Sequence, residues 1–348
     1  MVFEEEAMRV RALLLLLGAL SLAKAQQVVN VYNWADYLPP KVIKLFEAQT
    51  GIHVNYATFD SNQDLFIKLK ADPQAGYDVV FPSSYYIQRM AKAGLLLKLD
   101  HSQLSGMQNL NPRLLNRSFD PANEYSLPYD WGSTSIIVND KYYDPHSIKN
   151  WTDLWQKRFR GQLLLTNDER DVFAIGLRTM GYSINEQDPE KIRQAYLKMK
   201  ALLPNVKLFN SAGTQPIYLD EDATVGVIDS GDAYNIMRIN PHLHFIYPHD
   251  GVNLWVDCMA ISANAPHKSN AYAFVNFLLQ PKIAKMISLS LGYSTPNEKA
   301  VQQMPKEDRD NPILNPPAWI FKHAEFEGDV GKATHLYLRY WELLKLSA

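Results

Sequence analysis

The first hundred residues after position 26 alternate between two spacings of apolar side chains. Residues 27–34, 52–59 and 77–83 have the short apolar or alternating pattern of buried and half-buried strands. Residues 39–51, 61–72 and 85–96 repeat apolar positions every three or four residues, as amphipathic helices do. Pro39 and Pro40 suit the start of the first helix, Gly51 its end, and Ser61 the N-cap of the second. This order of elements predicts a parallel sheet that is covered by helices on both faces.

The same α/β pattern continues to the end of the chain. We expect strands at 134–139, 161–168, 223–230, 243–248 and 252–262, and helices at 170–181, 190–204, 269–292 and 334–347. Residues 126–140 and 256–268 are predicted to be extended crossovers between two substructures. In sheets of this kind, ligands bind beyond the carboxyl ends of the strands, often between domains.

The N-terminal segment has the composition of a secretory signal peptide. Arg9 and Arg11 precede an apolar run over 12–22, and the small residues Ala23 and Ala25 flank Lys24. The apolar run is about half as long as a membrane-spanning helix needs to be. We therefore expect export and cleavage after Ala25. Because Cys258 is the only cysteine, the exported chain can form no internal disulfide, which favours the periplasm.

Composition narrows the class of protein further. The chain has 348 residues, of which 47% are hydrophobic and 21% charged, as in ordinary globular proteins. Its formal net charge of −2 argues against a nucleic acid as partner. No Gly-rich phosphate loop, complete set of His and Cys ligands or nucleophilic triad stands out, so no cofactor, metal site or enzyme activity is predicted. His242 and His244 share a strand face, but no third ligand can be named beside them.

Carboxylates and aromatic rings recur where the predicted strands end. On these positions, and on two later loops, we expect a ligand site made of Trp34, Asp36, Tyr37, Ser83, Tyr85, Asp168, Asp171, Asp229, Trp255, Asp257, Tyr293 and Glu327. Carboxylates accept charge-assisted hydrogen bonds from ammonium groups. Indole and phenol faces cover methylene chains and attract cations, each by roughly 0.5–2 kcal/mol. The combination predicts capture of an organic cation with an apolar body.

Longer blocks of the sequence resemble one family. The blocks "YNWADYLPP", "YDVVFPSSYYIQRM", "FDPANEYSLPYDWG", "GQLLLTNDERDVF" and "GYSTPN" are similar to signatures of the periplasmic spermidine/putrescine-binding proteins of bacterial ABC importers. The resemblance covers essentially the whole exported chain. It implies an α/β, two-lobed periplasmic-binding-protein fold of type II, with hinge crossings and the ligand in the cleft between lobes. It also implies a monomeric receptor that delivers a polyamine to an inner-membrane permease.

On this resemblance the chain divides into segments. Residues 1–25 are the signal peptide, 26–132 and 257–310 form the first lobe, and 133–256 form the second lobe, with C-terminal helices over 311–348. The resemblance implies that Trp34, Asp36 and Tyr37 belong to the first-lobe cradle, where the acid is commonly Glu. Asp36 would receive an ammonium group between the two rings. Trp255 and Asp257 match the pair that fixes one ammonium end of the ligand.

The remaining matches include two departures from the family pattern. Ser83 and Tyr85 match a second ligand-facing loop, Asp168 an acidic contact, and Tyr293 another wall; Asp171 stands where spermidine binders carry Glu. Asp229 replaces a Trp and Glu327 a Gln of the spermidine binders. Both changes predict a more acidic pocket, suited to a longer or more highly charged amine or to a guanidino-amine.

Other interpretations of these residues remain open. Asp168 could cap the helix that follows it, and Asp229 could belong to an ordinary turn. A receptor of the same fold could take another cation (agmatine, cadaverine or spermine), an anion or ferric iron, although an anion would require basic groups in the cleft. Asp168 and Asp257 could also act as an acid–base pair in a hydrolase. A sensor that reports polyamines to a signalling protein is a further alternative.

Overall fold

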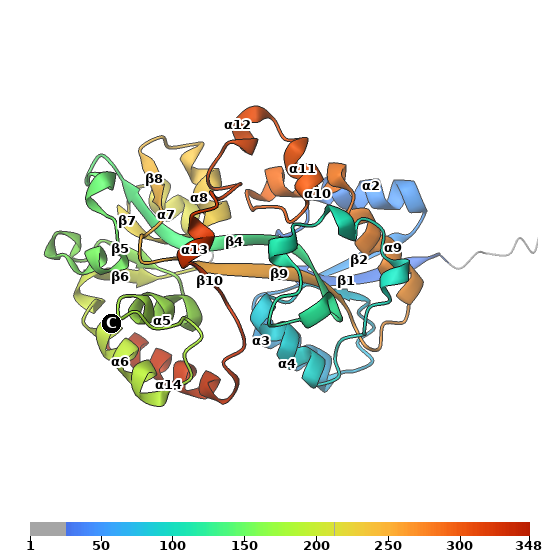
Figure 1. Ribbon diagram of the computed structural model, residues 1–348, viewed down its shortest axis with the longest axis horizontal. Helices are drawn as coiled ribbons and strands as arrows, with labels where there is room; N and C mark the ends of the chain where they lie inside the picture. Colours follow the sequence, from blue (N-terminus) through green and yellow to red (C-terminus); the bar gives the residue numbers. More distant parts are fainter. Residues whose placement is uncertain (1–25, 212) are drawn as a thin grey trace, which may run out of the picture.

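The computed structural model describes residues 26–211 and 213–348, so the predicted signal peptide lies outside the described residues. One mixed sheet of ten strands runs along the molecule in the order β2-β1-β3-β9-β4-β7-β5-β6, with β10 beside β9 and β8 beside β4 (Figure 1). The strands are β1 Val28–Trp34, β2 His53–Phe59, β3 Val79–Val80, β4 Ser126–Asn139, β5 Leu163–Leu165, β6 Val206–Phe209, β7 Val225–Asp229, β8 Leu243–Ile246, β9 Asn253–Ile261 and β10 Glu325–Phe326.

The first lobe lies on the right in Figure 1 and is built on β1, β2 and β3. These strands are parallel, as predicted. Side chains of β1 alternate between the two faces: Val29 and Val31 pack in one core, and Tyr32 packs in another. The first core includes residues of α2 Pro40–Thr50, α9 Lys268–Leu278 and α10 Pro281–Leu291, and the second includes residues of α3 Asn62–Ala71 and α4 Ser84–Lys92.

The second lobe repeats this arrangement around β5, β6 and β7. One face packs against α5 Glu169–Arg178, α6 Pro189–Lys200 and α14 Thr334–Lys345, and the other against α7 Thr214–Leu219 and α8 Ser230–Met237. Three short helices complete the chain: α11 Glu298–Gln302, α12 Lys306–Arg309 and α13 Ile320–His323. In the described part of the chain, no helix combines the length and apolar character that crossing a membrane requires.

Two long antiparallel strands, β4 and β9, join the lobes in the middle of the view (Figure 1). Asp130 of β4 lies opposite Asp257 of β9, and Gly132 lies opposite Trp255. The predicted crossovers therefore coincide with these two strands over much of their length. The C-terminal segment makes a further passage, because α13 packs beside the β4–β9 pair while α14 packs in the second lobe.

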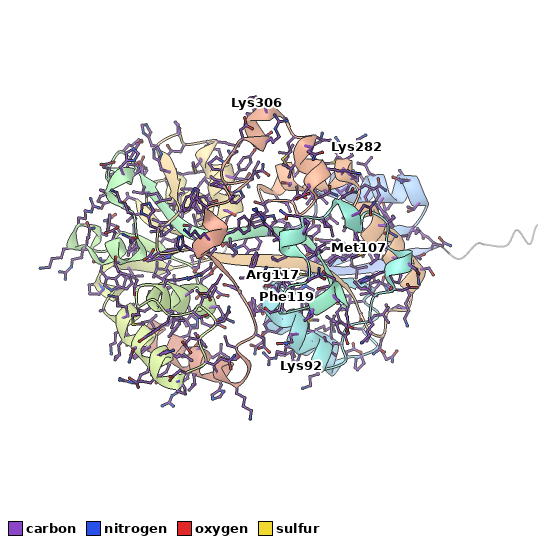
Figure 2. The ribbon with its side chains drawn as sticks, viewed as in Figure 1. Lys92, Met107, Arg117, Phe119, Lys282 and Lys306 are labelled. Carbon is purple, nitrogen blue, oxygen red and sulfur yellow. The ribbon has the colours of Figure 1, made fainter. Side chains whose placement is uncertain are left out.

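A loop of the first lobe holds this C-terminal passage in place. The guanidinium carbon of Arg117 lies 4.3 Å from the ring centroid of Phe326, and Trp131 packs against Phe321 at 5.4 Å. Figure 2 labels Arg117 and Phe119 near the centre of the molecule, whereas Lys92, Lys282 and Lys306 are on its outer rim. The passage therefore belongs to the junction between the lobes.

Two predicted elements differ from the observed ones. The single helix expected over 269–292 is two helices, α9 and α10, because Pro281 lacks the N–H that a continuous helix needs and begins a new helix instead. The sheet is mixed, because the crossing strand β9 pairs antiparallel with β3 and with β4. Periodicity locates strands but carries no information on the direction of their pairing.

Candidate ligand-binding site

A cavity of about 460 Å³ opens between the lobes. Its lining combines aromatic rings, carboxylates and small polar groups: Trp34, Ala35, Tyr37, Phe59, Asp60, Asn62, Ser83, Tyr85, Thr134, Asp168, Asp171, Ser211, Asp229, Trp255, Asp257, Tyr293 and Glu327. Every residue predicted for the site lines this cavity, with the exception of Asp36. The volume is within the range of small-molecule sites in proteins.

Asp36 is exposed to solvent and does not line the cavity. Its φ of 54° is in the left-handed region, so the chain turns sharply there after β1. Asp36 is therefore the one predicted site residue outside this lining, and its contact with an ammonium group stays a prediction. The two rings lie in the cavity wall without the carboxylate that separates them in the sequence.

The topology explains why residues far apart in sequence meet here. Trp34, Ser83, Asp168 and Asp229 stand at or just beyond the carboxyl ends of β1, β3, β5 and β7. Within each lobe the strands are parallel, β1 with β3 and β5 with β7, so their carboxyl ends lie together, where α/β proteins bind ligands. The antiparallel strands β9 and β4 between them set the two pairs in opposite directions, and residues after both pairs line the same cavity. Trp255 and Asp257 come from within the crossing strand β9, and their two-residue spacing places both on the cavity face, as predicted.

Aromatic rings in the cavity wall form two groups of contacts. Trp34 packs against Phe59 with ring centroids 4.6 Å apart, and its indole N–H donates to the Phe81 carbonyl. Tyr293 contacts Tyr37 at 5.7 Å and Trp255 at 5.1 Å. These contacts fix the rings before any ligand arrives, so little side-chain entropy remains to be lost on binding.

Glycines make room for two of these rings. A Cβ on Gly132 would lie 2.4 Å from a ring carbon of Trp255, and one on Gly231 would lie 2.2 Å from Tyr293. Both distances are shorter than any allowed contact, so each ring occupies space that only glycine leaves open. The positions of Trp255 and Tyr293 thus depend on the backbone of β4 and α8.

First-lobe polar groups hold the acid of β9. The Tyr37 hydroxyl donates to Asp257 Oδ2 at 2.7 Å, and the Ser83 backbone forms a bridge with Asp257. Asn62 donates to the Ser83 and Tyr85 hydroxyls at 3.0 and 3.1 Å and accepts from the Ser83 N–H at 2.9 Å. Each of these side chains is therefore oriented by a hydrogen bond to another residue of the cavity wall.

Second-lobe acids lie close to one another on the opposite wall. Asp168 caps α5 and accepts from the backbone N–H groups of Arg170 and Asp171 at 2.7 and 3.1 Å. The capping role suggested by the sequence is therefore present, on a residue that also lines the cavity. Asp229 accepts from the Thr134 hydroxyl at 2.7 Å and stands directly before α8, in place of the turn considered for it.

Burial of so many acids raises their pKa values. Burial is the largest cause in each case: it raises the pKa of Asp257 to about 6, of Asp229 to about 7 and of Glu327 to about 8. The pKa of Asp171 is well above its usual value through burial and through the charges of Asp168, Glu327 and Asp229. The empty cleft thus disfavours the very charges that a cation would stabilise.

No Lys, Arg or His is among the residues that line the cavity in the described chain. Arg170 lies behind the wall, where its guanidinium donates to the Gly328 carbonyl at 3.0 Å and to Asn185 Oδ1 at 2.8 Å. Its charge lowers the pKa of Glu327, which burial raises more strongly. The electrostatic character of the cavity is therefore acidic, which excludes an anion as the best-matched ligand.

Several lining residues were not predicted, namely Ala35, Phe59, Asp60, Asn62, Thr134 and Ser211. Phe59 ends the predicted strand 52–59 and Asp60 and Asn62 follow it, so the rule that located the other strand ends would also have indicated them. Thr134 lies on β4 and Ser211 follows β6. Their approach to the site depends on strand order, which the pattern of residues does not give.

Other residues singled out by their chemistry lie outside the cavity. Cys258 is a buried free cysteine. His242 and His244 each contact Asp140, at 2.7 and 2.8 Å. Over the described residues, no three His, Cys, Asp or Glu side chains are grouped so that they could hold a metal ion. Trp151 is fully buried in the core of the second lobe.

Comparison with known proteins assigns the family. The model of the bacterial extracellular solute-binding proteins matches residues 41–315. The spermidine/putrescine-binding periplasmic protein of Escherichia coli K12 is 40% identical over 338 residues, which cover 95% of this chain and 97% of that protein. Spermidine/putrescine-binding periplasmic protein 1 of Haemophilus influenzae is 36% identical over 93% of this chain and 90% of its own. The chain belongs to the bacterial extracellular solute-binding proteins.

Solved structures agree with this assignment. The spermidine/putrescine ABC transporter substrate-binding protein PotD of Streptococcus pneumoniae superposes with a TM-score of 0.83 at 34% identity, over 92% of this chain and 99% of that one. A putative spermidine/putrescine ABC transporter protein of Listeria monocytogenes gives 0.86 at 35% identity, over 92% and 100%. The predicted two-lobed periplasmic-binding-protein fold and the family resemblance are thereby confirmed. The curated relatives are named periplasmic proteins, in agreement with the predicted location.

Proposed function

We propose that this protein is the periplasmic substrate-binding subunit of a polyamine ABC importer. It captures a spermidine- or putrescine-type cation in the cavity between its lobes and delivers it to an inner-membrane permease. The observation that carries the proposal is the composition of the cavity. Carboxylates from both lobes and two groups of aromatic rings surround a space without any basic side chain among the described residues. The names of the most similar relatives supply the ligand class.

The two walls take different parts of the ligand in this proposal. Asp257, held by the Tyr37 hydroxyl, binds one terminal ammonium group. Trp34, Trp255 and Tyr293 cover the methylene chain and attract the cation through their ring faces. Asp168, Asp171, Asp229 and Glu327 receive the remaining ammonium groups, and Ser83 and Tyr85 add polar contacts.

Closure follows from the division of the lining between lobes. With lobe boundaries near residues 132 and 257, Asp168, Asp171 and Asp229 move with the second lobe, and Tyr37 and Ser83 move with the first. A ligand that binds acids of both lobes at once favours the closed form over the open form. A monovalent cation would contact only one lobe and would favour closure less.

The acid count supports a preference for a more highly charged amine. The cavity is lined by Asp60, Asp168, Asp171, Asp229, Asp257 and Glu327, which exceeds what the two charges of putrescine can neutralise. Each unpaired buried acid must stay protonated or remain unfavourably charged. We infer that affinity rises from putrescine to spermidine and spermine. Agmatine and cadaverine, with two charges each, should behave as putrescine does.

We also infer that the protein acts as a monomer and catalyses no reaction on its ligand. The rings that enclose the cavity suit retention of an intact amine, and the hydrolase alternative requires a turnover product. Sedimentation with and without polyamine tests the first inference. Recovery of unchanged amine after long incubation with the protein tests the second.

Calorimetric titration of the chain lacking residues 1–25 tests the ligand class. Putrescine, cadaverine, agmatine, spermidine and spermine should be compared at low and high salt, because screening weakens a charge-dominated interaction. We expect a saturable 1:1 isotherm, tightest for spermidine or spermine. Tightest binding of putrescine would refute the preference for higher charge while leaving the class intact. Absence of binding across all five amines would refute the proposed function.

A further inference from the structure

A buried carboxyl group that does not line the cavity lies directly behind Asp257, the first-lobe acid of the cavity. Asp130 lies on β4, opposite Asp257 on β9, and is 2% exposed. The Tyr37 hydroxyl lies between them, 3.0 Å from Asp130 Oδ1 and 2.7 Å from Asp257 Oδ2. Asp130 Oδ2 is buried and makes no hydrogen bond with any described residue.

The Tyr37 hydroxyl has too few hydrogens to donate to both Asp130 and Asp257. A phenol hydroxyl carries one hydrogen, so it can donate to only one of two carboxylates at hydrogen-bond distance. The other contact is favourable only if that carboxyl is protonated and donates to the phenol oxygen. Two ionised carboxylates directly opposite on neighbouring strands would also repel each other in a medium of low dielectric. One of the two acids must therefore hold a proton.

The surroundings of Asp130 and Asp257 identify which of the two acids holds the proton. Asp257 lines the open cavity and has a second hydrogen bond, from Ser83, which lowers its pKa. Asp130 has no donor other than Tyr37, and burial raises its pKa well above the usual value. The titratable groups that face Asp130 are neutral or acidic and offer it no positive charge: Tyr37 after β1, Tyr129 on β4, Asp257 and Cys258 on β9, and Tyr293 after α10.

We propose that Asp130 is a protonated positioning residue that directs the Tyr37 hydroxyl toward Asp257, so that Asp257 meets the ligand as a full carboxylate. The Asp130 carboxyl donates to the Tyr37 oxygen, and the phenol donates to Asp257. Because β4 and β9 are the strands that join the lobes, this chain of hydrogen bonds holds the ammonium site at the hinge. The effect on ligand affinity rests on the proposed function; the position of the proton does not.

The first measurement is infrared spectroscopy of the ligand-free protein at pH 7. Difference spectra between wild type and Asp130→Asn should contain a protonated-carboxyl C=O stretch that belongs to Asp130. If the spectrum instead loses a carboxylate band, Asp130 is ionised and the proposal is overturned. This readout needs no polyamine, so it remains decisive even if the proposed ligand class fails.

The second measurement is polyamine affinity in two variants of similar volume. Asp130→Leu removes the donor to the Tyr37 oxygen, and we expect spermidine to bind about tenfold more weakly. Asp130→Asn replaces a neutral donor with another neutral donor, so it should restore most of that loss. If Asp130 only filled space, the Leu and Asn variants would bind spermidine with similar affinity. An Asn variant as weak as the Leu variant would contradict the proposal.

Tyr37→Phe gives an independent test if the substitutions at 130 do not fold. Loss of the phenol removes a hydrogen bond that lowers the pKa of Asp257. Asp257 should then be protonated over a wider pH range, so the ratio of variant to wild-type Kd should be several-fold larger at pH 6 than at pH 8. A ratio that stays constant with pH would show that Tyr37 does not control the ionisation of Asp257.

Discussion

Binding of a polyamine should release protons, because the empty cavity holds its acids partly protonated. Glu327 is the clearest case, since burial raises its pKa to about 8 and the group lines the cavity. At pH 7 it is about nine-tenths protonated, and an ammonium group that binds it must first remove that proton. With one pKa unit equal to 1.36 kcal/mol, ionising it costs about 2.7 kcal/mol at pH 6 and about 0.4 kcal/mol at pH 8.

Affinity should therefore rise with pH. The difference corresponds to about a fiftyfold tighter Kd at pH 8 than at pH 6 from Glu327 alone, if the ligand holds the group fully ionised. Asp229, whose burial raises its pKa to about 7, adds a further factor of about ten. At pH 7 the two groups together release about 1.4 protons, about 0.9 from Glu327 and about 0.5 from Asp229. The amines stay charged over this range, since alkylammonium groups titrate near pH 10.

Calorimetry in buffers of different ionisation enthalpy measures the released protons directly. Glu327→Gln should lower the release by about 0.9 proton and the pH effect by about fiftyfold. Glu307→Gln is the matched control, because Glu307 is an exposed residue of α12 outside the cavity lining. If Kd varies by less than about threefold between pH 6 and 8 and no proton is released, the acids are ionised in the empty site and the reasoning fails.

Three further predictions concern stability and packing. Because the pKa values of the cavity acids are raised, the ligand-free folded state binds more protons than the unfolded chain does. The thermal midpoint of unfolding should therefore fall by several degrees from pH 5 to pH 8, and a midpoint that rises would contradict this. Asp168→Ala should lower the free energy of unfolding by about 1 kcal/mol through loss of the α5 cap. Asp168→Asn should keep the cap and weaken only ligand binding. Urea unfolding measures the first effect and calorimetric titration with spermidine measures the second. Gly132→Ala should displace Trp255 and weaken spermidine binding by about tenfold or more. Gly328→Ala is the control, because its Cβ would meet nothing nearer than 3.7 Å, and it should leave binding unchanged. Equal Kd values in the two variants would show that the position of the Trp255 indole is unimportant.

Local chemistry made part of this site predictable. The turn residues Pro40 and Gly51, the cap Asp168 and the two-residue spacing of Trp255 and Asp257 act over a few residues, and all are found in the structure as the sequence indicates. The rule that ligands lie beyond strand ends located most of the lining. Asp36, whose φ is 54°, is the predicted site residue that lies outside the lining.

The sequence by itself determined the α/β class, the family and the acidic, aromatic chemistry of the site. These follow from the periodicity of apolar positions and from the type of residue at each position. Only the tertiary structure decided how the acids meet. Asp130 and Asp257 are far apart in the chain and become neighbours only through the antiparallel register of β4 and β9. Their shared phenol and the raised pKa values of the cavity acids depend on burial and on distances across the fold. Those quantities are properties of the packed chain and are not encoded in any short stretch of it.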